Sequence, residues 1–65
     1  MTKRTPVTLH GHEIGATVAT DHNTHEAWLF TAGLGYTPAG FGEYIFDTQA
    51  EAEQAVIKEH RRISR

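Results

Sequence analysis

The clearest pattern of hydrophobic and polar positions lies in the last third of the chain, where a strand pattern gives way to a helix pattern. Residues 44–46, Tyr-Ile-Phe, form a short aromatic run that is typical of a strand. Thr48, followed three residues later by Glu51, fits a capping box. In that motif the threonine hydroxyl accepts from the Glu51 amide and the carboxylate reaches back to the Thr48 amide. We therefore predict a helix over residues 48–63.

The predicted helix has one apolar stripe. Apolar side chains recur at helical spacing, with the stem of Glu59 between them: Ala52, Ala55, Val56 and Ile63. Most of these side chains are small, so the helix axis should lie close to the surface on which it packs. We expect that surface to carry large aromatic rings.

Strand patterns precede the helix. Val7 and Leu9 alternate with polar residues and predict a short first strand. Residues 14–20 and 25–31 flank the turn-forming sequence Asp-His-Asn-Thr and predict a hairpin. Residues 33–42 contain four glycines and a proline and predict a loop.

The order of these elements defines the expected architecture. We predict one domain over residues 1–65, with a flexible N-terminus over residues 1–5. Its class is α+β, with a small antiparallel sheet of three or four strands packed on one C-terminal helix.

Alternation along the strands assigns two apolar faces to the sheet. Trp28 and Phe30 share one face, as Tyr44 and Phe46 do in the last strand. The other face should be aliphatic and carry Ile14, Ala16, Val18, Ala27, Leu29 and Ile45. One helix covers one face, and we assign it to the aromatic side. The aliphatic face then needs the first strand, the glycine-rich loop, a second copy or a partner.

Length and composition limit the ways in which such a fold is stabilised. A chain of 65 residues buries only about 60% of the surface that its unfolded form exposes. Without cysteine, disulfides and thiolate metal sites are excluded, which leaves oligomerisation or a histidine-bound metal as further support. No apolar run has the length of a signal peptide or a membrane span, so we expect a cytoplasmic protein without a membrane partner.

Charge is unevenly distributed along the chain. All six lysines and arginines lie near the ends, and the block from Thr5 to Ile57 contains seven acids and no lysine or arginine. A sheet built from this block would repel phosphate. Such a surface also fits a solvated face whose charges serve solubility alone.

Candidate chemistry is sparse. His10 and His12, and the group Asp21, His22 and His25, have side chains that bind zinc or nickel, but their spacing favours surface histidines, and we expect no metal. The glycine-rich run precedes a strand and contains no lysine or arginine, unlike a phosphate-binding loop. Ser64 is the only serine and lies beside the C-terminus. We therefore predict no enzymatic activity, no cofactor and no small-molecule substrate.

Residues 44–55, Tyr-Ile-Phe-Asp-Thr-Gln-Ala-Glu-Ala-Glu-Gln-Ala, resemble the last strand and helix opening of AP2-type DNA-binding domains and of the related arm-binding domains of phage integrases. The resemblance implies a three-stranded antiparallel sheet that packs on one helix and enters the major groove of DNA. Those families read DNA with arginines and tryptophans on the strands. Here the predicted strands hold no arginine and only Trp28, so the resemblance supports the fold more than the function.

We predict a non-enzymatic protein-interaction module that forms a homodimer or binds and modulates a larger protein, as accessory proteins of phages and mobile elements do. Its expected contact residues come from the aliphatic face and the glycine-rich loop: Val18, Leu29, Tyr36 and Phe41.

The alternative is a small protein that binds duplex DNA, either through the sheet or through a cluster of cations near the C-terminus. This cluster consists of Lys58, Arg61, Arg62 and Arg65. The same cations also suit the C-terminal end of a helix dipole without any ligand.

Overall fold

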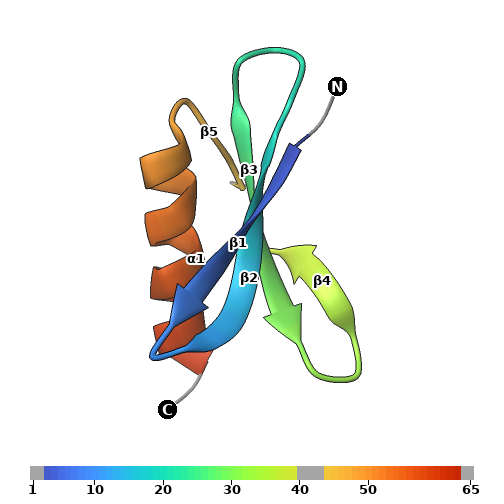
Figure 1. Ribbon diagram of the computed structural model, residues 1–65, viewed down its shortest axis with the longest axis vertical. Coiled ribbons are helices and arrows are strands. Elements are labelled where there is room, and N and C mark those ends of the chain that lie inside the picture. Colours follow the sequence, from blue (N-terminus) through green and yellow to red (C-terminus); the bar gives the residue numbers. More distant parts are fainter. Residues whose placement is uncertain (1–2, 40–43, 64–65) are drawn as a thin grey trace.

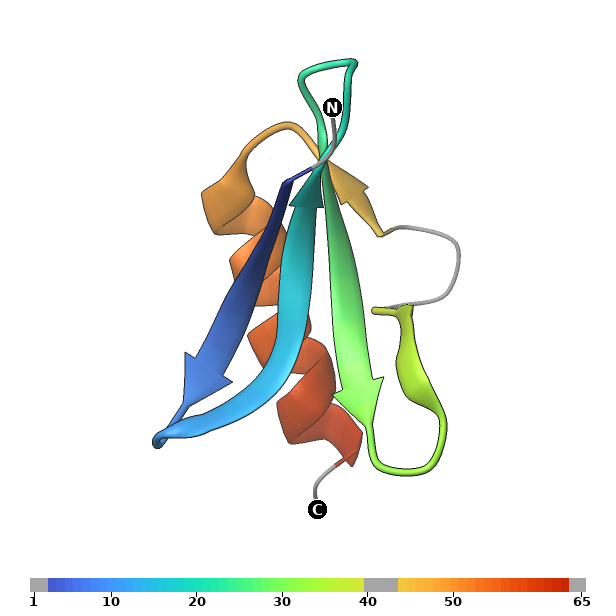
Figure 2. The same cartoon turned by 45° about the vertical axis from the view of Figure 1, so that its right-hand side comes forward.

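The structure is a computed structural model and describes residues 3–39 and 44–63. Its elements are β1 (Lys3–Leu9), β2 (His12–Ala19), β3 (His25–Thr31), β4 (Gly35–Pro38), β5 (Ile45–Phe46) and α1 (Gln49–Ile63). All strand pairs are antiparallel, and α1 lies on one side of the sheet (Figures 1 and 2). The fold is therefore α+β, as predicted from the sequence.

Tight turns connect the first three strands, which lie in the order β1-β2-β3. The β1–β2 turn uses His10 and Gly11 with φ of 53° and 81°, the positive values that a two-residue hairpin turn requires. In the β2–β3 turn, the Thr20 amide donates to the Thr24 carbonyl at 2.9 Å, and Asn23 has a φ of 61°. The hairpin predicted around residues 21–24 is thus confirmed.

Two short strands share the outer edge of β3. β4 pairs with the second half of β3, and β5 pairs with its beginning. Between them, the Ala27 amide donates to the Tyr44 carbonyl at 2.7 Å and the Ala27 carbonyl accepts from the Ala39 amide at 2.9 Å. The loop expected over residues 33–42 therefore contains a strand, β4, which its glycines and proline did not indicate.

β1 also extends beyond its predicted start. It begins at Lys3 rather than Val7, and residues 3–5 pair with residues 17–19 of β2. Residues 3–5, expected to belong to a flexible N-terminus, therefore form part of the sheet. Pro6 is tolerated because β1 is an edge strand, where a missing amide donor breaks no sheet hydrogen bond.

The start of α1 agrees with the predicted cap. The Thr48 hydroxyl oxygen accepts from the Glu51 amide at 3.2 Å. The Glu51 carboxylate accepts from the Thr48 hydroxyl at 3.0 Å, rather than from the Thr48 amide as the capping box predicts. The helix therefore begins where the sequence places it, with a different second hydrogen bond.

α1 packs on the face of the sheet opposite to the predicted one. The buried core lies between the helix and this face and consists of Val7, Ile14, Ala27, Leu29, Ala39, Ala52 and Val56. Trp28 and Phe30 alternate with Ala27 and Leu29 along β3, so they lie on the other side. The prediction that the helix covers the aromatic face is therefore wrong.

The reason is steric. A Cβ atom built on Gly15 would lie 2.6 Å from Val56 Cγ1 and 2.2 Å from the Trp28 carbonyl oxygen, so this approach of helix to sheet requires glycine. Small residues on the helix pack against small residues on the sheet, whereas aromatic rings would hold the helix away. The predicted stripe is confirmed at Ala52 and Val56, but Ile63 is 49% exposed.

A β-bulge in β2 changes which side chains share a face. Val7 pairs with Gly15 while Thr8 pairs with Glu13, which leaves Ile14 without a partner residue. The extra residue turns Ile14 into the core and sends Glu13 to the opposite face. Ile14 therefore does not share a face with Ala16 and Val18, as simple alternation had indicated.

The two residues of β5 lie on the opposite faces of the sheet from those predicted. Ile45 lies opposite Glu26 and is 52% exposed, whereas Phe46 lies opposite His25 and packs against the core. Ile45 therefore joins the aromatic face and Phe46 leaves it.

The assignment of faces predicts unequal effects for two neighbouring residues. Leu29→Ala should lower the free energy of unfolding by about 2–4 kcal/mol, because it opens a cavity under α1. Phe30→Ala should cost about 1 kcal/mol or less, because it removes a half-exposed ring and one ring–ring contact. Urea unfolding followed by circular dichroism measures both. The opposite order of effects would place the helix on the aromatic face.

Candidate interaction surface: the open face of the sheet

The side of the sheet opposite to α1 carries three rows of side chains, because directly paired residues point to the same face. We call this surface the open face. The first row is Arg4, Val18, Glu26 and Ile45, and the second is Pro6, Ala16, Trp28 and Pro38. The third contains Thr8, Glu13, Phe30 and Tyr36. Within the described residues, α1 is the only helix, and it lies on the other side.

Aromatic rings on the open face hold one another in place. Phe30 and Tyr36 meet edge to face, with ring centroids 5.3 Å apart and planes at 60°. Trp28 and Tyr44 do the same at 5.6 Å and 68°. Such contacts stabilise ring positions beyond simple burial. Phe30 nevertheless stays 44% exposed, so this face presents ordered apolar surface to its surroundings.

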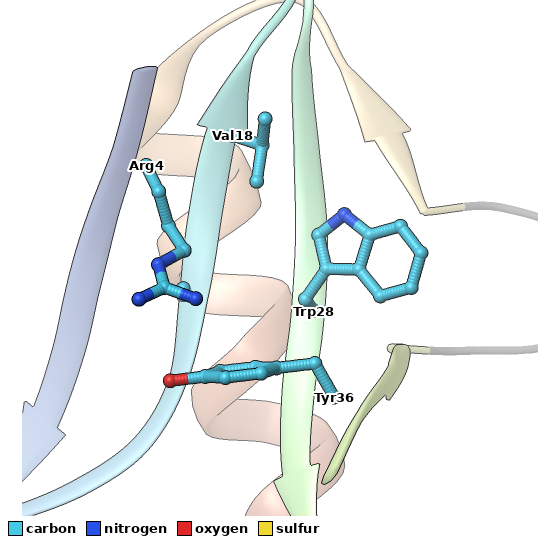
Figure 3. A pocket seen from close by; sticks show the side chains of 5 residues that line it. Arg4, Val18, Trp28 and Tyr36 are labelled. Atoms are coloured by element: carbon cyan, nitrogen blue, oxygen red, sulfur yellow. The ribbon is translucent and has the colours of Figure 1, made fainter. Parts of the chain in front are cut away.

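A hollow of about 250 Å³ lies on the open face and is lined by Arg4, Ala16, Val18, Trp28 and Tyr36. Figure 3 shows the Tyr36 ring lying across the sheet, with Val18 and Trp28 above it and α1 behind the strands. The Ala16 side chain is small and fully buried. The hollow therefore exists because a small residue stands between larger neighbours.

Polar contacts fix the rim of this hollow. The Tyr36 hydroxyl donates to the Glu13 carboxylate, and the Arg4 guanidinium carbon lies 5.0 Å from the centre of the Tyr36 ring. Trp28 Nε1 donates to Glu26 Oε1 at 3.0 Å. The guanidinium is attracted to the ring face as a cation–π pair. The aromatic side chains are thus held in place by contacts within the chain itself.

The bond to Glu13 also changes the acidity of Tyr36. Because the carboxylate accepts from the phenol, the pKa of Tyr36 is raised above its ordinary value of 10.0. Loss of hydration and the negative charge of Glu13 raise it further, and Arg4 opposes the shift. The phenol therefore stays protonated and acts as a hydrogen-bond donor at neutral pH.

The predicted contact residues do not all lie on one surface. Val18 and Tyr36 line the hollow. Leu29 is 5% exposed and lies under α1 in the core, so it is not available to a partner. Phe41 lies outside the described residues. Trp28, Phe30 and Arg4 were not selected from the sequence as protein contacts. Alternation placed Trp28 and Phe30 on one face, but the assignment of α1 to that face excluded them.

The predicted basic cluster lies on the opposite side of the molecule from the open face. Lys58, Arg61 and Arg62 belong to the last turns of α1, and Arg65 lies outside the described residues. Arg62 forms an ion pair with Glu59, which lowers the pKa of Glu59 and raises that of Arg62. One of the expected cations is therefore already engaged within the helix.

The histidines lie in turns and at strand starts. His10 is in the β1–β2 turn and His22 in the β2–β3 turn, while His12 and His25 begin β2 and β3. Over residues 3–39 and 44–63, no three acidic or histidine side chains are grouped so that they could hold a metal ion. In the same part of the chain, no helix is long and apolar enough to cross a membrane.

Comparisons with known proteins add no relative: no protein-family model, curated protein or solved structure matches the chain. The resemblance of residues 44–55 to AP2-type and integrase arm-binding domains stays a prediction. The fold and the open face together define a small sheet-on-helix domain with one uncovered aromatic surface.

The Tyr36–Glu13 contact gives a pH prediction. Glu13→Gln should move the pKa of Tyr36 down towards 10.0, because a neutral amide favours the protonated phenol less than a carboxylate does. The pKa of Tyr36 is higher in the folded than in the unfolded chain. The contact therefore contributes its full stability at pH values below the unfolded pKa of tyrosine, and this contribution is lost as the pH rises through the folded pKa.

The ¹³Cζ chemical shift of Tyr36, followed by NMR as pH rises, measures this change. Glu53→Gln, on the exposed surface of α1, is the matched control and should leave the Tyr36 titration where it was. An identical Tyr36 titration in Glu13→Gln and in the unmodified protein would contradict the assigned contact.

Proposed function

We propose that this protein is a non-enzymatic protein-interaction module and that it binds protein through the open face. The observation that carries the proposal is the uncovered apolar surface formed by Val18, Trp28, Phe30, Tyr36 and Ile45. Phe30 and Ile45 are 44% and 52% exposed, and the rings beside them are held in fixed orientations. Grouped, ordered apolar side chains of this kind mark interaction sites. Aromatic residues supply much of the binding energy at such sites.

The charges of the open face favour protein over duplex DNA as the ligand. Among its described residues, Arg4 is the single cation, and Glu13 and Glu26 are acidic. Affinity for DNA comes largely from cations that contact phosphates. A face with more acids than cations would repel the DNA backbone.

The side chains on this face also favour binding over catalysis. Its described residues include no serine, cysteine or histidine, the groups that most often act as nucleophiles or as proton carriers in catalysis. In this proposal the bound domain modulates a larger protein, in the manner of accessory proteins of phages and other mobile elements.

A capture experiment tests the proposal. The protein is immobilised and exposed to a lysate of its native cell, and bound proteins are quantified by mass spectrometry. Phe30→Asp should lower specific capture at least about tenfold, because it puts a charge in the centre of an apolar contact. Capture by the unmodified protein should weaken far less between about 50 and about 200 mM salt than DNA binding does, since its main driving force is apolar burial.

Leu34→Asp is the matched control. Leu34 is 76% exposed but lies in the β3–β4 turn, so its variant should capture as the unmodified protein does. Circular dichroism confirms that each variant is folded. Two results together would favour the DNA-binding alternative. Phe30→Asp would capture as much protein as the unmodified chain, and the chain would bind duplex DNA with an affinity that falls steeply at higher salt.

A further inference from the structure

Resting on the proposed function, we propose that the partner of the open face is a second copy of this chain, packed face to face about a two-fold axis that runs along β2. The order of charges across the sheet supports this arrangement.

The first row of the open face is self-complementary in charge. Arg4 and Glu26 both lie directly opposite Val18, one on each side of β2. A two-fold axis along β2 exchanges the two sides. It places Arg4 of each copy over Glu26 of the other, and Val18 over Val18. Face-to-face sheets lie about 10 Å apart, a gap that an arginine and a glutamate side chain span together.

The side chains of the second row also have complementary shapes about the same axis. Pro6 and Trp28 lie on opposite sides of Ala16, so the axis places each proline over the indole ring of the other copy. Ala16 lies close to the axis, and its small side chain lets the two sheets approach. Sheets that pack face to face lie about 10 Å apart, with strands nearly aligned. The hollow beside Ala16 gives room for the side chains that interdigitate.

The size of the domain also favours a second copy. The core between one helix and one face of the sheet holds seven buried residues among those described, and domains with so small a core are commonly stabilised by association. Four strands about 4.8 Å apart and about 20 Å long present roughly 400 Å² on each copy, or about 800 Å² in total. This total lies below the standard size of stable interfaces, so we expect a weak, reversible dimer that dissociates at micromolar concentrations or above.

Charge reversal tests the pairing of Arg4 with Glu26. Sedimentation equilibrium measures the dimer dissociation constant of the unmodified protein, Arg4→Glu and Glu26→Arg, each from about 5 to about 500 µM. Each single variant places like charges at both contacts, so its dimer should weaken at least about tenfold. An equimolar mixture of the two variants places unlike charges at both contacts. The mixture should therefore associate with an affinity within about threefold of the unmodified protein.

Two controls carry the same charge changes elsewhere. Lys3→Glu is one residue from Arg4 but on the other face of β1, and Glu53→Arg lies on the exposed surface of α1. Both should dimerise as the unmodified protein does. Circular dichroism checks that Glu26→Arg is folded, since it also removes the acceptor of the Trp28 Nε1 hydrogen bond.

The outcomes separate this inference from the proposed function. A monomer at every concentration, or a dimer that the mixture of variants does not restore, would overturn the second copy as occupant. If the capture of other proteins still depended on Phe30 in that case, the proposed function would stand without the dimer. Loss of both dimerisation and face-dependent capture would overturn the two together.

Discussion

The fold depends on the close approach of α1 to β2 and β3. At Gly15, a side chain of any size would collide with Val56 or with the carbonyl oxygen of Trp28. The small residues Ala27 and Ala52 are fully buried at the same contact. Glycine and alanine at this contact let helix and sheet meet, with the aliphatic side chains of Ile14 and Leu29 packed beside them. The bulky rings of β3 are left on the other side. The uncovered aromatic face is thus a direct consequence of how the core packs.

The β-bulge at Ile14 determines which side chains of β2 lie in the core and which lie on the open face. It adds an aliphatic side chain to the core and moves Glu13 to the open face, where its carboxylate accepts from the Tyr36 hydroxyl. A bulge reverses the alternation of side chains and bends the strand locally. One local irregularity therefore contributes both to the stability of the core and to the order of the candidate interaction surface.

Much of the architecture could be predicted from the sequence because local signals specify it. The cap at Thr48 and Glu51 and the turn at residues 21–24 have chemistry that acts over a few residues, and both elements were located correctly. The buried face could not be predicted, because it depends on matching two surfaces distant in sequence. The bulge at Ile14 and the strand β4 depend on pairing with neighbouring strands, which alternation and glycine content do not report. For the same reason Leu29 was assigned to the surface and Trp28 to the core.

The aromatic face is turned away from α1, and we propose that it packs against the same face of a second copy. Isotope-filtered NMR on an equimolar mixture of labelled and unlabelled protein distinguishes this arrangement from others, because the spectrum contains only contacts between copies. We predict intermolecular NOEs from the Val18 methyl groups of one copy to the Val18 and Arg4 side chains of the other, and none to α1. Intermolecular NOEs that arise instead from α1, for example at the exposed Ile63, would contradict the account.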